Sequence, residues 1–217
     1  MTPRCTVDAF TVAGDPPVRG VLHRVDAAGD ALVLTHGAGS NHRAPLLLAL
    51  AEAFAADGMT VLRCDLPYRQ ARPKGPPSPA GAARDRQGLL AALAALGAYA
   101  SGRRFLGGHS YGGRQASMAL AESPAAAAGL LLLSYPLHPP GKPERPRIAH
   151  LAAIRVPTVF VHGTRDPFGT IGAIDAARAL IPAPTELVTV TGAGHDVPVD
   201  AATVRAILTA WHRCTDR

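Results

Sequence analysis

The stretch that decides the fold is Leu106-Gly107-Gly108-His109-Ser110-Tyr111-Gly112-Gly113. It follows a short run at 104–106, which we expect to be a strand, and leads into a helix expected over 114–122. Gly108, Ser110 and Gly112 match G-x-S-x-G, the pattern of a sharp strand-to-helix turn that exposes a serine hydroxyl. Glycine is expected on both sides because a side chain there would collide with neighbouring backbone, and the helix N-terminus would favour a developing anion. The alternative is a glycine-rich turn with an incidental serine.

Apolar runs of strand length alternate with helical patterns along the rest of the chain. Strands are expected at 5–12, 18–25, 31–35, 60–64, 104–106, 129–134, 156–162 and 186–191. Helices with one apolar stripe are expected between most of them, with starts at Pro45 and at Ser78-Pro79. This alternation predicts an α/β fold: a mostly parallel sheet of about seven or eight strands with helices on both faces. The chain of 217 residues suits one domain over 1–217.

Composition limits the possible classes of protein. With 47% hydrophobic and 18% charged residues, the chain is typical of a globular domain. Its longest apolar run is much shorter than the ~20 residues of a membrane-spanning helix, and no apolar signal segment follows Met1. We therefore expect a cytoplasmic protein without membrane contact. The three cysteines are widely spaced, so neither a disulfide nor a metal site is expected.

The net charge of +6 comes almost entirely from arginines that are dispersed along the chain. They show no interleaved aromatic residues, whereas nucleic-acid binding needs a clustered basic face. We therefore expect no nucleic-acid partner. A phosphate-binding glycine loop is also disfavoured, because neither G-K-[ST] nor G-x-G-x-x-G follows the first parallel strand.

A serine nucleophile needs a histidine as its base, and five histidines follow Ser110 in the sequence. His195 comes directly after the last expected strand, between glycine-rich residues, and is the predicted base. The other four fit worse. His162 lies at the end of a strand and His212 on the terminal helix. His138 and His150 precede any carboxylate at a strand end, apart from Glu144 in the same loop.

A carboxylate must orient that histidine, and in proteins with this turn it lies between the serine and the histidine in the chain. Asp166 closes a tight turn after a buried strand and is the predicted acid. Asp175 falls within a helix, and Asp196 adjoins the base. The alternative role for Asp166 is to stabilise its own turn.

Two backbone amides are expected to form an oxyanion hole. One is that of Tyr111, directly after the serine, and the other comes from the loop at 36–39. Ala38 is the first choice there and Gly39 the second, because small residues let a substrate carbonyl approach the main chain.

With these loops in place, the sequence resembles the α/β-hydrolase superfamily over nearly its full length. The stretches that carry a narrower resemblance are THGAGSN, DLPYRQAR, GGHSYGGRQASM, SYPLHPPGKPERPRIAHL and HGTRDPFG. They are similar to a bacterial dienelactone-hydrolase-like subfamily, to the hydrolase-like domain of a subunit of a eukaryotic chromatin complex (NSL) and to a testis-expressed relative. The resemblance implies Ser110, Asp166 and His195 as the catalytic triad.

These observations predict a serine hydrolase, carboxylesterase-like, that cleaves a small ester, thioester or lactone through an acyl-enzyme. The expected partner is a small-molecule acyl substrate, the expected state is a monomer or homodimer, and no metal or organic cofactor is expected. Acyl transfer and perhydrolysis are close variants of the same chemistry. A non-catalytic binding or scaffolding protein on the same fold is the alternative.

The substrate pocket is expected to be uncapped, because only about twenty residues join the strands at 129–134 and 156–162. The proline-rich loops 65–79 and 135–150 should form its rims. Candidates for its lining are Tyr68, His138 and His109, although packing beneath the turn is favoured for His109. Members of the subfamily that this sequence resembles often have Lys or Arg at the position of His109 and Met at the position of Tyr111. Four arginines near these loops could attract an acidic substrate, with a structural role as the alternative: Arg69, Arg72, Arg114 and Arg147.

Overall fold

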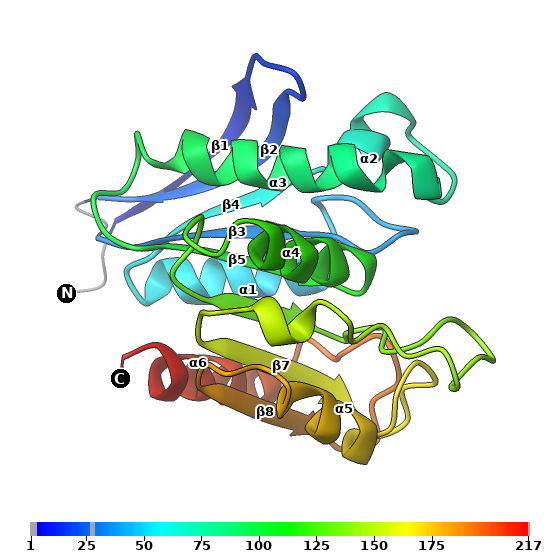
Figure 1. Ribbon diagram of the computed structural model, residues 1–217. Coiled ribbons are helices and arrows are strands. Elements are labelled where there is room, and N and C mark those ends of the chain that lie inside the picture. Colours follow the sequence, from blue (N-terminus) through cyan, green and yellow to red (C-terminus); the bar gives the residue numbers. More distant parts are fainter. Residues whose placement is uncertain (1–3, 27–28, 217) are drawn as a thin grey trace.

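The protein is built around one eight-stranded sheet in the order β1-β2-β4-β3-β5-β6-β7-β8 (Figure 1). The computed structural model describes residues 4–26 and 29–216. The strands are β1 (Cys5–Val12), β2 (Val18–Val25), β3 (Ala31–Thr35), β4 (Thr60–Cys64), β5 (Arg104–His109), β6 (Leu130–Leu133), β7 (Thr158–Gly163) and β8 (Thr185–Val190). Strand β2 runs antiparallel to β1 and β4, and all other neighbours are parallel. The predicted mostly parallel sheet is therefore confirmed.

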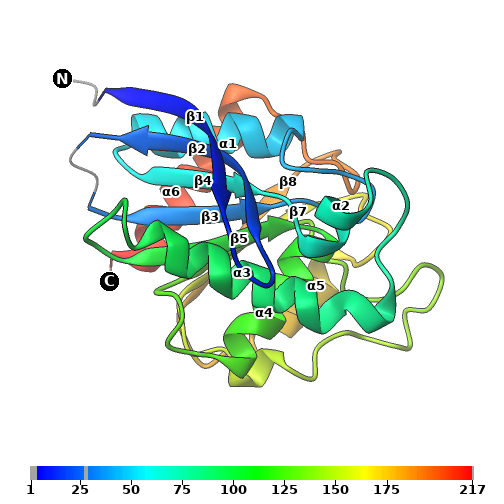
Figure 2. The same ribbon diagram turned by 90° about the horizontal axis from the view of Figure 1, so that it is seen from above.

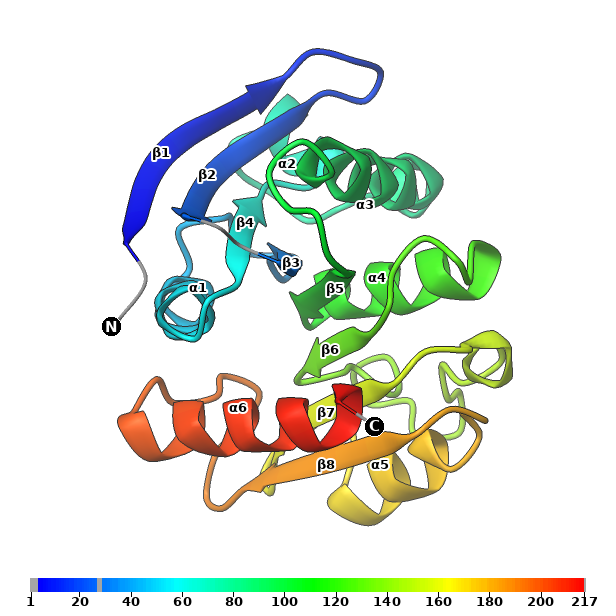
Figure 3. The same ribbon diagram turned by 90° about the vertical axis from the view of Figure 1, so that its left-hand side faces the viewer.

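Helices cover both faces of this sheet (Figure 3). They are α1 (Pro45–Ala56), α2 (Pro67–Ala71), α3 (Ala82–Leu96), α4 (Tyr111–Glu122), α5 (Ile171–Arg178) and α6 (Ala201–Thr215). Helices α1 and α6 bury their apolar sides in one core, where Trp211 packs against Phe54 and Phe105. Helices α3, α4 and α5 bury theirs in a second core on the opposite face. Two separate apolar cores follow from strands such as β3, which is buried on both faces.

The first two strands form a hairpin that reaches past the sheet and lies over α3 (Figure 2). Phe10 on β1 packs edge-on against Tyr99 just beyond α3, with ring centroids 5.5 Å apart. This hairpin confirms the predicted antiparallel start of the sheet.

Strands β6, β7 and β8 differ from the predicted bounds by only one or two residues, and the larger differences lie around Ser110 and in loop 65–79. Strand β5 continues to His109, because residues 107 and 108 still pair with β3 and β6 although they lack side chains. Helix α4 begins at Tyr111 rather than at Arg114. Loop 65–79 contains α2, a single turn too short to show an apolar period.

The carboxyl ends of the parallel strands meet at one edge of the sheet. Thr35, the last residue of β3, is level with Cys64 and Gly108, and His109 is level with Leu133. The loops after β3, β5, β7 and β8 therefore converge at this edge, where ligands of open α/β sheets bind. Within the described residues, no helix combines the length and the apolar character needed to cross a membrane.

Candidate active site

Ser110 lies at the corner between β5 and α4 with a strained backbone. Its φ of 51° and ψ of −116° fall where side-chain-bearing residues are uncommon. A Cβ on Gly108 would lie 2.7 Å from the carbonyl carbon of Gly112, and one on Gly112 would lie 2.4 Å from the oxygen of His36. Because both contacts are with backbone, the turn requires glycine at both positions. This strain holds the serine hydroxyl at the edge of the sheet.

His195 and Asp166 reach the serine from the loops after β8 and β7. His195 Nε2 lies 2.7 Å from Ser110 Oγ, and His195 Nδ1 lies 2.8 Å from Asp166 Oδ2. An ionised carboxylate only accepts, so Nδ1 carries the proton and Nε2 is free to accept from the hydroxyl. The structure thus brings the three residues predicted as nucleophile, base and acid into one hydrogen-bonded chain. Phe168 packs against the imidazole, with ring centroids 4.5 Å apart.

The Asp166 carboxylate is held in its charged form although its side chain is fully buried. Burial alone would raise its pKa, but hydrogen bonds from His195 and from the Phe168 amide (2.9 Å) outweigh that cost, and its pKa lies below the usual value. His162 Nε2 lies 3.7 Å from the same carboxylate and donates to the Gly169 carbonyl at 2.8 Å. His162 therefore packs within β7 and also fixes the loop that carries Asp166.

His109 does not line the cavity in front of Ser110; it borders a separate cavity between the start of α1 and the loop after β8. Its Nε2 is 3.2 Å from the carbonyl oxygen of His195. The two imidazoles are 5.3 Å apart between centroids, and burial lowers the pKa of His109. A neutral His109 that donates to this carbonyl holds the backbone of His195.

The predicted oxyanion amides are those of Tyr111 and Ala38. Within the described chain neither amide donates to another group. The Ala38 carbonyl accepts from the Tyr68 hydroxyl at 2.8 Å and from Arg69 Nη2 at 3.0 Å, so the loop is fixed from behind. Gly39 is exposed and does not border the cavity in front of Ser110.

Asp85 on α3 is a site residue that the sequence analysis missed. Its buried carboxylate accepts from the Tyr111 hydroxyl at 2.8 Å and from the Tyr68 amide at 3.0 Å. It therefore ties the turn at Ser110 to the segment that supports Ala38. Burial raises the pKa of Asp85 and that of Tyr111. No motif surrounds Asp85, so the sequence offers no signal for this contact.

A cavity of about 390 Å³ opens in front of Ser110. Ala38 and Tyr111 border it beside the serine, and its apolar wall comes from Phe168 and the prolines Pro76, Pro77, Pro79 and Pro136. Among the described residues, the charged ones that line this cavity are Arg114 and Arg147. Both predicted rims therefore contribute to the cavity.

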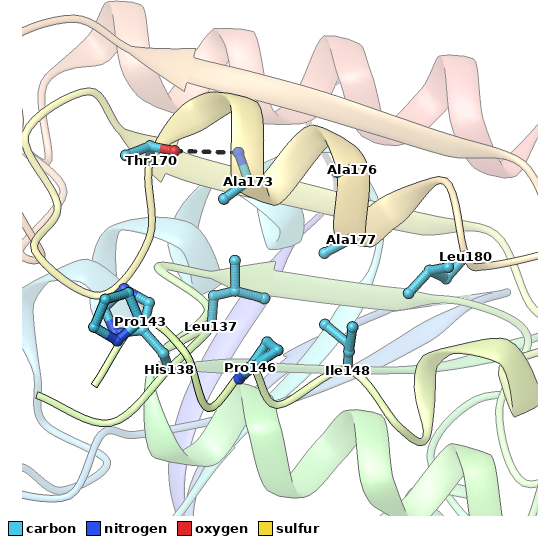
Figure 4. Close-up of a pocket in the computed structure, with 10 residues that line it drawn as sticks. All are labelled: Leu137, His138, Pro143, Pro146, Ile148, Thr170, Ala173, Ala176, Ala177 and Leu180. Carbon is cyan, nitrogen blue, oxygen red and sulfur yellow. Dashed lines mark hydrogen bonds between the residues drawn. The ribbon is translucent and has the colours of Figure 1, made fainter.

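Like His109, the other two predicted lining residues lie elsewhere. The Tyr68 side chain supports Ala38 from behind, and its burial raises its pKa to about 12. His138 borders a second, mostly apolar cavity of about 500 Å³ between α5 and loop 135–150 (Figure 4). Residues of the loop alternate between the cavities: Pro136 and Arg147 line the first, Leu137 and Pro146 the second. His138 thus lies behind the wall of the serine cavity.

The other two candidate arginines make local contacts. Arg69 is buried and donates to four backbone carbonyls. Arg72 is exposed and donates to the Pro76 carbonyl at 2.8 Å. In the residues described, no cluster of three or more His, Cys, Asp or Glu side chains could hold a metal ion.

Comparisons with known proteins agree with this architecture. A family model described as "Alpha/beta hydrolase domain" matches residues 28–215. A dienelactone hydrolase from Anabaena variabilis is 20% identical, with a TM-score of 0.75 and coverage of 99% of this chain and 97% of that one. An alpha-beta serine hydrolase homologue from Coxiella burnetii is 16% identical (TM-score 0.74, coverage 93% and 96%). An esterase of Pyrococcus furiosus is 15% identical (TM-score 0.74, coverage 97% and 91%). At these identities the solved structures show a shared fold.

Proposed function

The chain belongs to the α/β hydrolase domain family, and from that premise we propose that it is a carboxylesterase-like serine hydrolase acting on a small ester, thioester or lactone. The observation that carries the proposal is the hydrogen-bonded chain from Ser110 through His195 to Asp166, with the serine facing a cavity. A side chain held in a strained turn and bonded to an oriented base is the arrangement that nucleophilic catalysis requires.

The reaction follows from the protonation states. The Ser110 hydroxyl attacks the acyl carbon while its proton passes to His195 Nε2, and the buried Asp166 carboxylate stabilises the resulting imidazolium. The carbonyl oxygen becomes an oxyanion that the amides of Tyr111 and Ala38 would bind, each worth about 3 kcal/mol in the transition state. His195 returns the proton to the leaving group. Water then attacks the acyl-enzyme, with His195 again as the base.

The alternative is a scaffolding protein on the same fold, as the sequence resemblance to a chromatin-complex subunit suggests. A blocked serine or a displaced histidine would favour it. The open cavity and the 2.7 Å contact between Ser110 and His195 favour hydrolysis instead.

The test is labelling with a fluorophosphonate followed by turnover of a panel of short-chain esters. We expect the probe to modify Ser110, and Ser110→Ala to abolish labelling and lower kcat by about 10⁶-fold, since the triad acts as a unit. Ser134→Ala is the matched control: Ser134 also has a positive φ but is fully buried, so labelling should persist. Undiminished ester turnover in Ser110→Ala would refute the proposal.

A further inference from the structure

Arg114 lies one helical turn after Ser110, and its backbone amide donates to the Ser110 carbonyl at 3.0 Å. Its side chain borders the serine cavity. Its Nε is excluded from solvent, yet within the described chain its guanidinium donates no hydrogen bond and forms no ion pair. A guanidinium has five N–H donors, and leaving a buried one unused is costly.

Arg147 faces the same cavity from loop 135–150. Its backbone is fixed: the Arg147 amide donates to Leu137 at 2.7 Å, and its carbonyl accepts from the Tyr135 hydroxyl at 2.6 Å. Its guanidinium makes one long hydrogen bond, 3.3 Å, to the Pro136 carbonyl. Partial burial and the nearby charge of Arg114 lower the pKa of Arg147. A preorganised backbone thus carries a cation whose donors are mostly unused.

Among the described residues that line the cavity, none is acidic, so neither cation faces a carboxylate there. Arg86, by contrast, has a partner: its Nε lies 2.8 Å from Glu122, and its guanidinium also reaches Gln115. Like charges brought together beside an apolar wall destabilise each other unless an anion joins them. The site is therefore complementary to a negative group.

We propose that the substrate carries an anionic oxygen group, a carboxylate or a phosphate, which Arg114 and Arg147 bind while Ser110 attacks the acyl carbon. This inference rests on the proposed hydrolase function. Guanidinium groups suit the role because their planar donors pair with two oxygens at once. The contact orients the substrate at a fixed distance from the serine, and the bond-making steps remain those of the triad.

The test compares matched neutral and charged esters. The acyl arm pairs 4-nitrophenyl hemiglutarate with 4-nitrophenyl pentanoate. The alcohol arm pairs 3-acetoxybenzoate and 3-acetoxyphenyl phosphate with 3-acetoxytoluene. We expect the full-length protein to prefer a charged member by about 10- to 100-fold in kcat/KM, as for a hydrogen-bonded charge. The preferred arm shows which side of the ester carries the anion, and the alcohol arm distinguishes carboxylate from phosphate. Neutral preference in both arms would overturn the inference.

Variants separate a binding site from general charge attraction. Arg114→Gln and Arg147→Gln should each lower the charged-to-neutral ratio by about tenfold, and Arg114→Lys should lower it less because the charge remains. Arg205→Gln removes an equal charge from the exposed side of α6, on the opposite face of the sheet, and should leave the ratio unchanged. An equal fall in Arg205→Gln would also overturn the inference, because it would show long-range attraction only.

Failure of the proposed function is distinguishable from failure of this inference. In Ser110→Ala, binding of glutarate and of inorganic phosphate can be measured by calorimetry without turnover. Binding that is lost in Ser110→Ala/Arg114→Gln supports the site even if no ester is cleaved. Absent binding of both anions, together with fluorophosphonate labelling of the native protein, would refute the anion site and leave the hydrolase proposal standing.

Discussion

Two proline-rich loops, 65–79 and 135–150, border the serine cavity, and each carries an arginine. The first arginine donates hydrogen bonds to backbone, whereas the second leaves most of its donors unused. Arg69 of the first loop donates to the carbonyls of Ser40 and Ala38 at 2.8 and 3.0 Å. It also donates to carbonyls within its own loop. Arg147 of the second loop donates one hydrogen bond of 3.3 Å and faces the cavity.

The difference shows that position in a rim does not decide what an arginine does. Arg69 is 6% exposed and its donors are used by backbone, so it stabilises the fold and fixes Ala38. Arg147 is also partly buried, but most of its donors remain available. The role of each arginine follows from how many of its guanidinium N–H donors form hydrogen bonds within the protein.

Replacing Arg69 should have the largest effect on stability. Arg69→Met removes the four hydrogen bonds that this buried guanidinium donates to backbone carbonyls, and we expect the free energy of unfolding to fall by about 3–5 kcal/mol. Because Ala38 loses a support, turnover of charged and neutral esters should fall together. Urea unfolding and the two kcat/KM values measure these effects.

Arg72→Met is the matched control on the same loop. Arg72 is exposed and makes one hydrogen bond to the Pro76 carbonyl, so the loss should stay below about 1 kcal/mol. An equal fall in the free energy of unfolding in both variants would show that the hydrogen bonds of Arg69 contribute no more to stability than the single bond of Arg72.

The second loop depends on a neutral histidine at its end. His150 Nε2 lies 2.7 Å from Ser117 Oγ, and burial together with the charge of Arg114 lowers the pKa of His150 to about 4. An unfolded histidine titrates near 6.5, so between about pH 6.5 and 4 the unfolded chain binds more protons. Stability is therefore full above about pH 6.5 and is lost as the pH falls, by up to about 3 kcal/mol from this residue.

His150→Gln should flatten the pH dependence of unfolding in this window by up to one proton, measured by urea denaturation at several pH values. His23 on β2 provides the comparison, because burial also lowers its pKa to about 4, far from the loop. His23→Gln should remove a similar part of the slope, and the double variant should remove both. An unchanged slope in His150→Gln would show that the histidine is hydrated when the loop is folded.

Much of the fold could be predicted from the sequence because its local signals agree. The buried strands are continuous apolar runs bounded by glycine, proline or aspartate, and α1 begins at a proline. The exceptions have no such signal. Helix α2 is one turn long, and β5 extends through Gly107 and Gly108, whose pairing depends on neighbouring strands rather than on their own side chains.

The candidate site could be predicted only where its residues follow strand ends. Ser110, Asp166 and His195 do, and the structure brings them into contact. Asp85 reaches the site from a helix through a contact between residues far apart in the chain, which no local pattern records. His138 was expected in the pocket because it lies in the correct loop. The direction of a loop side chain depends on how the backbone turns, and neighbours there face opposite cavities.

The smallest effect on stability is expected at Arg147 of the second loop. Arg147→Gln removes one long hydrogen bond and relieves the repulsion between two cations, so the free energy of unfolding should change by less than about 1 kcal/mol in either direction. Urea unfolding beside Arg69→Met measures the contrast. A loss as large as that of Arg69→Met would mean that the Arg147 guanidinium binds backbone in solution and is as saturated as Arg69. A near-neutral result leaves its donors free for a ligand, because a fold that loses nothing without them does not use them.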